Sequence, residues 1–541
     1  MKNCKYFIIL IATLVFNTSI GQVNNTSKPN ILFIAIDDLK PLIGAYGNTL
    51  VKTPNIDRLA KRGTTFINNY CQQAVCGPTR ASILTGMRPD YTQIWDLKTQ
   101  LRTVSPGIVT MPEYLITQGY TTLGIGKVFD PRNVDQDLDK VSWSVPYYKT
   151  DKKYYAPDFG EPSQGRYQNK NTKALVESVI REAVASGKSK AEAREEANVK
   201  VKPATESEDV PDNAYNDGAN ILQAIQILSE IKNNATPFFF AVGISKPHLP
   251  FVAPKKFWDL YKRDQIKVAP FQDQIRNPIS VAYHNAGELR SYTDIPEVIA
   301  STSQKDFGLT LGDEKQKELL HGYYASISYT DALVGKLLDA IDEFGLASNT
   351  VIVLWGDHGW HLGDHNLWCK HSNFEEATRA PLIISDPRIK SNTTNSISEH
   401  VDVFPTLCEL AGVPVPGQLQ GKSLVPLMKN PAAIVKEFAV SQYPRSSGMA
   451  ESERLGYANG NIMGYSIRNN RYRYTIWINK GFRSTVAFNE ANVVGVELYD
   501  YIKDPLEKIN VADQIEYLNE SKNLKKSMLE YLASQVKPLN K

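Results

Sequence analysis

A short motif around one cysteine gathers the residue types with the most evident chemistry. It reads Cys76-Gly-Pro-Thr-Arg80-Ala-Ser-Ile-Leu-Thr-Gly86. Pro78 suits the first turn of a helix and Gly86 suits its end. Cys76 is then expected at the helix N-terminus, where free backbone N–H groups and the helix dipole favour anions. With Arg80 one turn further on, this place would lower the pKa of a thiol and would also suit a sulfate or phosphate group.

The cysteine alone allows simpler interpretations. Cys76 could form a disulfide with Cys71, or it could be an unreactive buried side chain. Five cysteines among 541 residues are too few for a disulfide scaffold. Support for a chemical role must therefore come from other parts of the chain.

Acidic residues follow two apolar runs of the sequence. Asp37-Asp38 ends the first run, and Asp357-His358 follows a later one. Such residues can cap a helix or form a turn. If they gather at one place, however, the carboxylates repel one another and need a cation. Hard oxygen ligands of this kind select Ca²⁺ or Mg²⁺.

The apolar runs predict an α/β fold. Residues 30–36, 237–243 and 350–355 are continuous apolar segments, as expected of strands buried on both faces. Helical patterns lie between them, for example at 219–231 and 324–344. This alternation favours a mostly parallel sheet sandwiched by helices. Ligands of such sheets bind at the carboxyl ends of strands, which is where the acidic residues fall.

The chain is expected to divide into a large and a small part. We predict a catalytic domain at 28–432 and a C-terminal α+β subdomain at 433–541, with strand-like segments within 464–477 and a closing helix at 514–534. Residues 170–210 are rich in Lys, Glu and Ala and predict an exposed helical insertion.

The N-terminus predicts export. Lys2 and Lys5 precede an apolar run that is shorter than the roughly 20 helical residues needed to span a bilayer. Small residues then suit cleavage before Gln22, so residues 1–21 are typical of a secretory signal peptide. An uncleaved membrane anchor is the alternative. We expect a soluble protein, secreted or periplasmic, without stable membrane insertion.

Composition argues against two broad classes of protein, although local basic patches remain possible. The chain has 61 basic and 58 acidic side chains, a formal net charge of +3. A general nucleic-acid binder would show a strong basic excess, so no nucleic-acid partner is expected. Apolar residues make up 42% and charged residues 22%, which excludes a wholly disordered chain.

Taken whole, the cysteine motif resembles the signature of the type I sulfatases, Cys-x-Pro-Ser/Thr-Arg followed by Leu-Thr-Gly. In that family the cysteine is converted to formylglycine, an aldehyde whose hydrate attacks sulfur and later expels sulfate by re-forming the aldehyde. The resemblance implies that a formylglycine-generating maturase modifies Cys76. It also implies that the fold is alkaline-phosphatase-like.

The resemblance covers most of the chain from residue 30 to about 510 and is closest to the branch that contains iduronate 2-sulfatase. The matching segments contain the same types of residue and follow one another in the same order along the chain. They are Asp37-Asp38-Leu39-Lys40-Pro41, residues 72–86, Arg88-Pro89-Asp90, Gly126-Lys127-Val128-Phe129, residues 242–250 with Lys246-Pro247-His248, Asp357-His358-Gly359-Trp360, Trp368, Lys370, Ser372-Asn373-Phe374, residues 441–445 and residues 463–468.

The resemblance implies one calcium ion per chain. Its ligands would be Asp37, Asp38, Asp357 and His358, with the modified residue 76 completing the shell. His358 stands where many sulfatases carry Asn, and nitrogen matches the oxygen preference of calcium poorly. The iduronate-type branch nevertheless has Asp-His at this place. The metal would polarise and hold the sulfate group.

The resemblance also implies a set of cations around the sulfate group. Arg80, Lys127, His248 and Lys370 would act with Cys76 as the catalytic residues. Lys127 and Lys370 would contact sulfate oxygens, and His248 would protonate the leaving alcohol oxygen. Judged by residue type alone, the lysines could instead be solvated and His248 could be a packed loop residue.

One position departs from the pattern. After Gly-Lys-Val-Phe the iduronate-type sequences have His, which assists the formylglycine hydrate as a base, whereas this chain has Asp130. Asp130 could accept the proton instead, or it could be a surface residue before Pro131. A further carboxylate near a sulfate and a carboxylated sugar would be repulsive. The departure therefore bears on the identity of the substrate.

These observations lead to one functional expectation and two alternatives. We expect a secreted sulfatase that acts on a sulfated oligosaccharide, with a 2-O-sulfated uronate as the substrate subclass. The first alternative is a formylglycine-dependent phosphonate or phosphate monoester hydrolase. The second is a non-catalytic glycan-binding relative.

Overall fold

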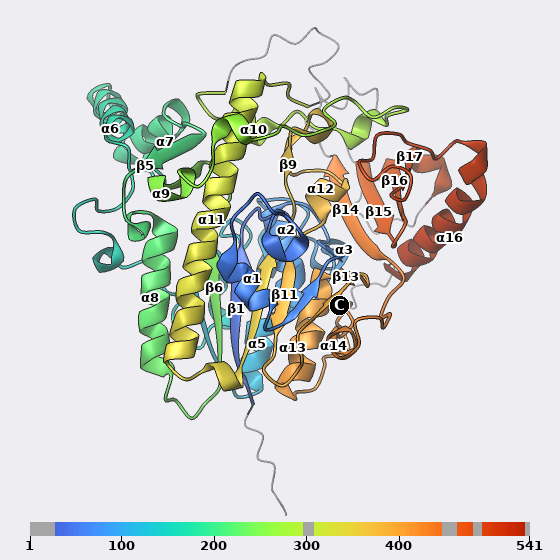
Figure 1. Cartoon of the computed structure of the whole chain (residues 1–541), viewed down its shortest axis with the longest axis horizontal. Coiled ribbons are helices and arrows are strands. Elements are labelled where there is room, and N and C mark those ends of the chain that lie inside the picture. Colours follow the sequence, from blue (N-terminus) through green and yellow to red (C-terminus); the bar gives the residue numbers. More distant parts are fainter. Residues whose placement is uncertain (1–27, 296–307, 446–461, 480–488, 536–541) are drawn as a thin grey trace, which may run out of the picture.

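A seven-stranded sheet forms the centre of the molecule (Figure 1). The computed structural model describes residues 28–295, 308–445, 462–479 and 489–535. The predicted signal peptide, residues 1–21, lies outside these described residues. Within the described ranges, no helix has both the length and the apolar character needed to cross a membrane.

The central sheet is mainly parallel, as predicted. Its strands, in spatial order, are β12 (Asn392–Thr394), β2 (Thr64–Phe66), β11 (Leu382–Ser385), β8 (Thr350–Gly356), β1 (Asn30–Ile36), β6 (Phe238–Ile244) and β4 (Thr121–Gly126). Strands β8, β1, β6 and β4 are parallel to one another. β11 is antiparallel to both of its neighbours, and β12 is parallel to β2. The three apolar runs coincide with β1, β6 and β8, which are buried on both faces.

Helices cover both faces of this sheet because alternate side chains of its strands enter different cores. The even-numbered side chains of β1 pack in a cluster with α1 (Pro54–Ala60), α8 (Asn216–Ile231) and α11 (Asp313–Glu343). The odd-numbered ones pack with α2 (Cys76–Thr85), α5 (Met111–Thr117), α13 (Val403–Ala411) and α14 (Val425–Lys429). In Figure 1, α8 and α11 run side by side along the sheet. The predicted α/β sandwich is therefore confirmed.

A smaller antiparallel sheet forms the C-terminal α+β subdomain. Its strands are β14 (Ala439–Arg445), β15 (Ile462–Arg468), β16 (Tyr472–Asn479) and β17 (Val493–Asp500), and α16 (Leu518–Gln535) packs on it. The predicted helical insertion forms α6 (Lys170–Ala185) and α7 (Lys190–Lys200). The boundary near residue 433 stays a prediction.

Short elements complete the described chain. They are β3 (Asn69–Tyr70), β5 (Thr205–Glu208), β7 (Phe251–Pro254), β9 (His361–Leu362), β10 (Trp368–Cys369), β13 (Ser398–Glu399), α3 (Pro89–Thr92), α4 (Leu101–Val104), α9 (Lys255–Trp258), α10 (Gly287–Arg290) and α12 (Glu375–Thr378).

Two glycines let the ends of β4 and β6 approach closely beside Lys127. A Cβ atom added to Gly243 would lie 2.2 Å from backbone atoms of Lys127. Gly126 has a φ of 77°, and a Cβ there would lie 2.0 Å from the carbonyl oxygen of Gly243. The backbone that presents Lys127 therefore depends on the absence of side chains at both positions.

We predict that Gly243→Ala lowers the free energy of unfolding by about 1–3 kcal/mol, because the Lys127 backbone must shift to admit the methyl group. Urea denaturation followed by circular dichroism measures the change. Gly107→Ala is the control, since a Cβ there meets no atom within 4 Å. Equal stability of the Gly243→Ala variant and the wild type would contradict the prediction.

Candidate active site

The cysteine motif forms the helix that the sequence predicts. Cys76 is the first residue of α2, and the helix ends at Gly86, whose φ of 66° is in the left-handed region. The thiol sulfur lies 3.5 Å from Nε2 of His358 and 3.9 Å from Oδ1 of Asp38. Cys76 therefore stands beside the predicted metal ligands.

The simpler disulfide interpretation is wrong. Cys71, Cys76, Cys369 and Cys408 are each free and buried. The predicted lowering of the thiol pKa is also wrong. Burial and the charge of Asp37 raise the pKa of Cys76 well above its usual value, against the opposing effect of Lys127 and Lys370. The helix N-terminus is so fully removed from water that desolvation outweighs its dipole. A raised pKa favours the protonated thiol, which is a poor nucleophile.

Three buried carboxylates lie together at the ends of two neighbouring strands. Asp37 and Asp38 follow β1, Asp357 follows β8, and each side chain is at most 1% exposed. Oδ1 of Asp357 accepts a hydrogen bond of 2.8 Å from the backbone N–H of Asp38. Asp38 has a φ of 58°, an unusual backbone for a residue with a side chain. Strained backbone of this kind is concentrated at functional sites.

The cluster could hold a metal ion. Ligand atoms of Asp38, Cys76, Asp357 and His358 all lie within 4.8 Å of one another. A second, overlapping group consists of Asp37, Asp38, Cys76 and His248. Nε2 of His358 is 3.3 Å from Oδ1 of Asp38, while its Nδ1 is 2.9 Å from the carbonyl oxygen of Gly359. That carbonyl fixes the ring so that Nε2 faces the carboxylates.

Arg80 lies behind the carboxylates and neutralises them. Its guanidinium is 0% exposed. It donates to Asp37 at 2.9 Å, to Asp357 at 3.0 Å and to the carbonyl oxygens of Lys127 and Val128 at 2.5 and 3.0 Å. It thereby ties α2 to the ends of β1, β8 and β4.

The remaining predicted cations converge on the same centre. Nζ of Lys127 is 2.5 Å from Asp37, and Nζ of Lys370 is 3.0 Å from Asp38. Nε2 of His248 is 3.8 Å from Asp38. The structure therefore brings together every predicted site residue, although the role of each stays a prediction: Asp37, Asp38, Cys76, Arg80, Lys127, His248, Asp357, His358 and Lys370.

Asp130 is not a surface residue, so that part of its interpretation is wrong. It is 2% exposed and accepts two hydrogen bonds, of 2.9 and 2.8 Å, from the guanidinium of Arg132. Burial alone would raise the pKa of Asp130, but the bond from Arg132 and the charge of Lys127 hold it below its usual value. A carboxylate held in this way is a weak base.

One residue of the centre was missed from the sequence. Glu288, in the short helix α10, lies 2.9 Å from Lys370 and 3.1 Å from His248. The stretch Asn285-Ala-Gly-Glu-Leu-Arg290 has no periodicity or motif that marks it. Only its position in three dimensions identifies it.

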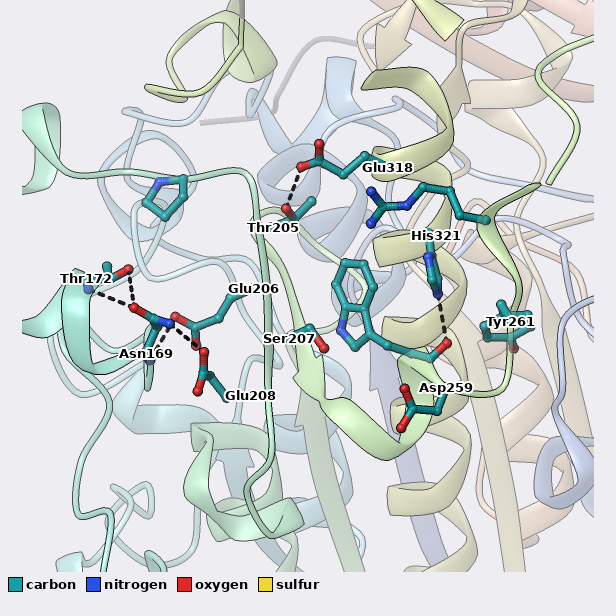
Figure 2. A pocket seen from close by; sticks show the side chains of 13 residues that line it. Asn169, Thr172, Thr205, Glu206, Ser207, Glu208, Asp259, Tyr261, Glu318 and His321 are labelled. Carbon is teal, nitrogen blue, oxygen red and sulfur yellow. Dashed lines mark hydrogen bonds between the residues drawn. The ribbon is translucent and has the colours of Figure 1, made fainter. Parts of the chain in front are cut away.

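A separate cavity of about 530 Å³ lies away from these residues, and Figure 2 shows its polar lining. Its walls come from the insertion, β5 and α11, with Asn169, Glu206, Glu318 and His321 among the side chains. None of the predicted site residues lines this cavity. This cavity therefore belongs to a different part of the surface from the predicted site.

Comparison with known proteins places this chain in a family. The family model described as Sulfatase matches residues 29–413, and that for the C-terminal part of N-sulphoglucosamine sulphohydrolase matches residues 363–534. The chain is 33% identical to iduronate 2-sulfatase of Mus musculus, over 95% of this chain and 97% of the relative.

Solved structures share the fold. Phosphonate monoester hydrolase of Agrobacterium radiobacter matches with a TM-score of 0.68 and 22% identity, over 94% of this chain and 96% of that chain. BT4656, solved with its substrate D-glucosamine-2-N,6-O-disulfate, matches with a TM-score of 0.65 and 21% identity, over 95% and 99%. From the family model and the sequence identity, the chain belongs to the sulfatase family. It is accordingly a sulfuric ester hydrolase with an alkaline-phosphatase-like fold.

We predict that Arg80→Gln lowers the free energy of unfolding by about 3–5 kcal/mol, because Asp37 and Asp357 then lose a buried counter-charge. Urea denaturation in the presence of a chelator measures the change. Arg62→Gln is the matched control, since Arg62 pairs with Asp342 at 2.7 Å while both side chains are more than a third exposed. The control should lose less than about 1 kcal/mol. Similar losses in both variants would contradict the prediction.

Proposed function

We propose that the protein is an exported, calcium-dependent sulfatase that removes 2-O-sulfate from uronates of polysaccharide-derived oligosaccharides, using formylglycine at position 76. The observation that carries the proposal is the position of Cys76 beside a buried carboxylate cluster with which Lys127 and Lys370 also pair. The sequence identity of 33% with iduronate 2-sulfatase of Mus musculus supports the substrate class. The N-terminal sequence supports export and cleavage of a signal peptide.

The carboxylate cluster fits calcium. Asp37, Asp38 and Asp357 offer buried oxygen ligands, and a divalent cation would relieve their mutual repulsion. His358 would add one nitrogen ligand. Bound there, calcium would supply a fixed positive charge that polarises the sulfate group.

The cations of the site would bind and stabilise the sulfate group. The ammonium groups of Lys127 and Lys370 lie against Asp37 and Asp38, beside Cys76. Fixed positive charges at this place would stabilise the negative charge that grows on sulfate oxygens during transfer. Nδ1 of His248 is 2.6 Å from the carbonyl oxygen of Leu249, so the ring donates there and directs Nε2 toward the centre. Nε2–H would protonate the leaving sugar oxygen.

Modification of Cys76 would supply the nucleophile. The raised pKa of the thiol argues against a thiolate at this position. Conversion to formylglycine by a maturase would instead supply the hydroxyl group of an aldehyde hydrate beside the metal ligands.

A phosphonate or phosphate monoester hydrolase is the second candidate. The TM-score of 0.68 with the Agrobacterium radiobacter enzyme favours it at the level of the fold. The same cluster of cations would accept a phosphoryl group, so activity has to decide between the two.

We predict that protein matured in its host releases sulfate from an unsaturated 2-O-sulfated uronate disaccharide and from 4-nitrophenyl sulfate, and hydrolyses 4-nitrophenyl phosphate and the monoester 4-nitrophenyl phenylphosphonate far more slowly. Ion chromatography measures the released anions, and the Cys76→Ala variant is the inactive control. Intact-peptide mass should show residue 76 about 18 Da lighter than cysteine. Hydrolysis of the phosphate or phosphonate monoester without sulfatase activity would contradict the proposal, and so would unmodified Cys76 in active protein.

A further inference from the structure

Glu288 connects two residues of the predicted catalytic set. Its Oε1 atom lies 3.1 Å from Nε2 of His248 and 3.1 Å from Nζ of Lys370. Its Oε2 atom lies 2.9 Å from the same Nζ. The Glu288 side chain is 21% exposed, so one side of it borders the solvent-accessible part of the centre.

Lys370 fixes Glu288 in place. Nζ of Lys370 donates to Oε1 of Glu288 and forms an ion pair with Oε2. The same Nζ also contacts Asp38 at 3.0 Å and lies 4.7 Å from the ring centroid of Trp360. Without the Glu288 carboxylate, Lys370 would therefore keep its contacts with Asp38 and Trp360. Lys370 does not depend on Glu288 for its position, whereas Glu288 depends on Lys370.

His248 depends on Glu288 more strongly. Its ring has one close acceptor on the Nδ1 side, the carbonyl oxygen of Leu249 at 2.6 Å. On the other side of the ring, Nε2 lies 3.1 Å from Oε1 of Glu288 and 3.8 Å from Oδ2 of Asp38, so Glu288 is the nearer of the two carboxylates. Asp38 is also assigned to the metal, while Glu288 belongs to neither group of possible ligands around Cys76. Glu288 is thus the carboxylate available to orient Nε2 when Asp38 holds a cation.

We propose that Glu288 is a positioning residue that, through its contact with Nε2, orients the ring of His248 so that Nε2 faces the place of the leaving oxygen of the substrate. This inference rests on the proposed sulfatase function. As sulfur bonds to a hydroxyl oxygen of the hydrate at position 76 and its bond to the ester oxygen breaks, the Nε2 proton leaves its contact with Glu288 and passes to the ester oxygen, giving a neutral alcohol and a neutral imidazole. Glu288 stays ionised and exchanges no proton.

The charge state of Glu288 agrees with this role. Burial alone would raise its pKa, but the charges of Lys370 and His248 hold it well below its usual value. A permanently ionised carboxylate is a steady acceptor for Nε2–H.

The test compares leaving groups. A sugar hydroxyl is a poor leaving group that needs a proton, whereas 4-nitrophenolate leaves without one. We expect Glu288→Gln to lower kcat for the 2-O-sulfated disaccharide by about 100-fold and for 4-nitrophenyl sulfate by less than about threefold. His248→Asn should show the same split. The double variant should lose little more than either single variant, since both changes remove one function.

Two controls exclude a general structural effect. Glu288→Gln should melt at the wild-type temperature, and Glu314→Gln, at a side chain 83% exposed, should keep both activities. Equal losses on both esters, additive losses in the double variant, or wild-type rates in Glu288→Gln would overturn the inference. If the wild type itself hydrolyses neither sulfate ester, it is the proposed function that fails.

Discussion

The site depends on the charge balance of three carboxylates buried at the carboxyl ends of two parallel strands. β1 and β8 pair in register from Asn30 with Thr350 to Ile36 with Gly356, so Asp37 and Asp357 necessarily leave the sheet side by side. The backbone N–H of Asp357 donates to the carbonyl oxygen of Ile36 at 3.1 Å and fixes this arrangement. An uncompensated buried charge costs several kcal/mol, so the fold requires cations at this place. Arg80, Lys127 and Lys370 supply them.

Two of these cations, Lys127 and Lys370, therefore have two possible kinds of partner, the buried carboxylates and the sulfate group of the substrate. Lys127 and Lys370 pair with Asp37 and Asp38, which are also proposed ligands of calcium. A divalent cation on these carboxylates would compete with the lysines and leave their ammonium groups available to sulfate oxygens. Arg80 is enclosed by carboxylates and carbonyl oxygens and would keep its structural contacts. The binding of calcium and of sulfate should accordingly be coupled.

Much of this arrangement could be predicted from the sequence because its signals are local. Continuous apolar runs identified β1, β6 and β8, and the position of acidic residues directly after two of them located the cluster. The cysteine motif and its resemblance to the sulfatases added the cations, and the structure brings all of them together. α11 begins at Asp313, earlier than the predicted 324, because its first turns are largely polar and carry little helical periodicity.

The remaining features depend on three-dimensional burial, which no local pattern records. Desolvation reverses the predicted shift of the Cys76 pKa, and the contact with Arg132 decides the state of Asp130. Glu288 meets Lys370 across 82 positions of the sequence. Strands β2 and β11 are too short to identify by periodicity.

The most direct test of this account is the affinity of matured protein for inorganic sulfate, measured by isothermal titration calorimetry with calcium and with a chelator. If the carboxylates hold calcium and thereby free Lys127 and Lys370, sulfate should bind at least about tenfold more tightly with calcium, a coupling of about 1.4 kcal/mol. Asp38→Asn should lose most of this coupling. Equal or weaker sulfate binding in the presence of calcium would contradict the account.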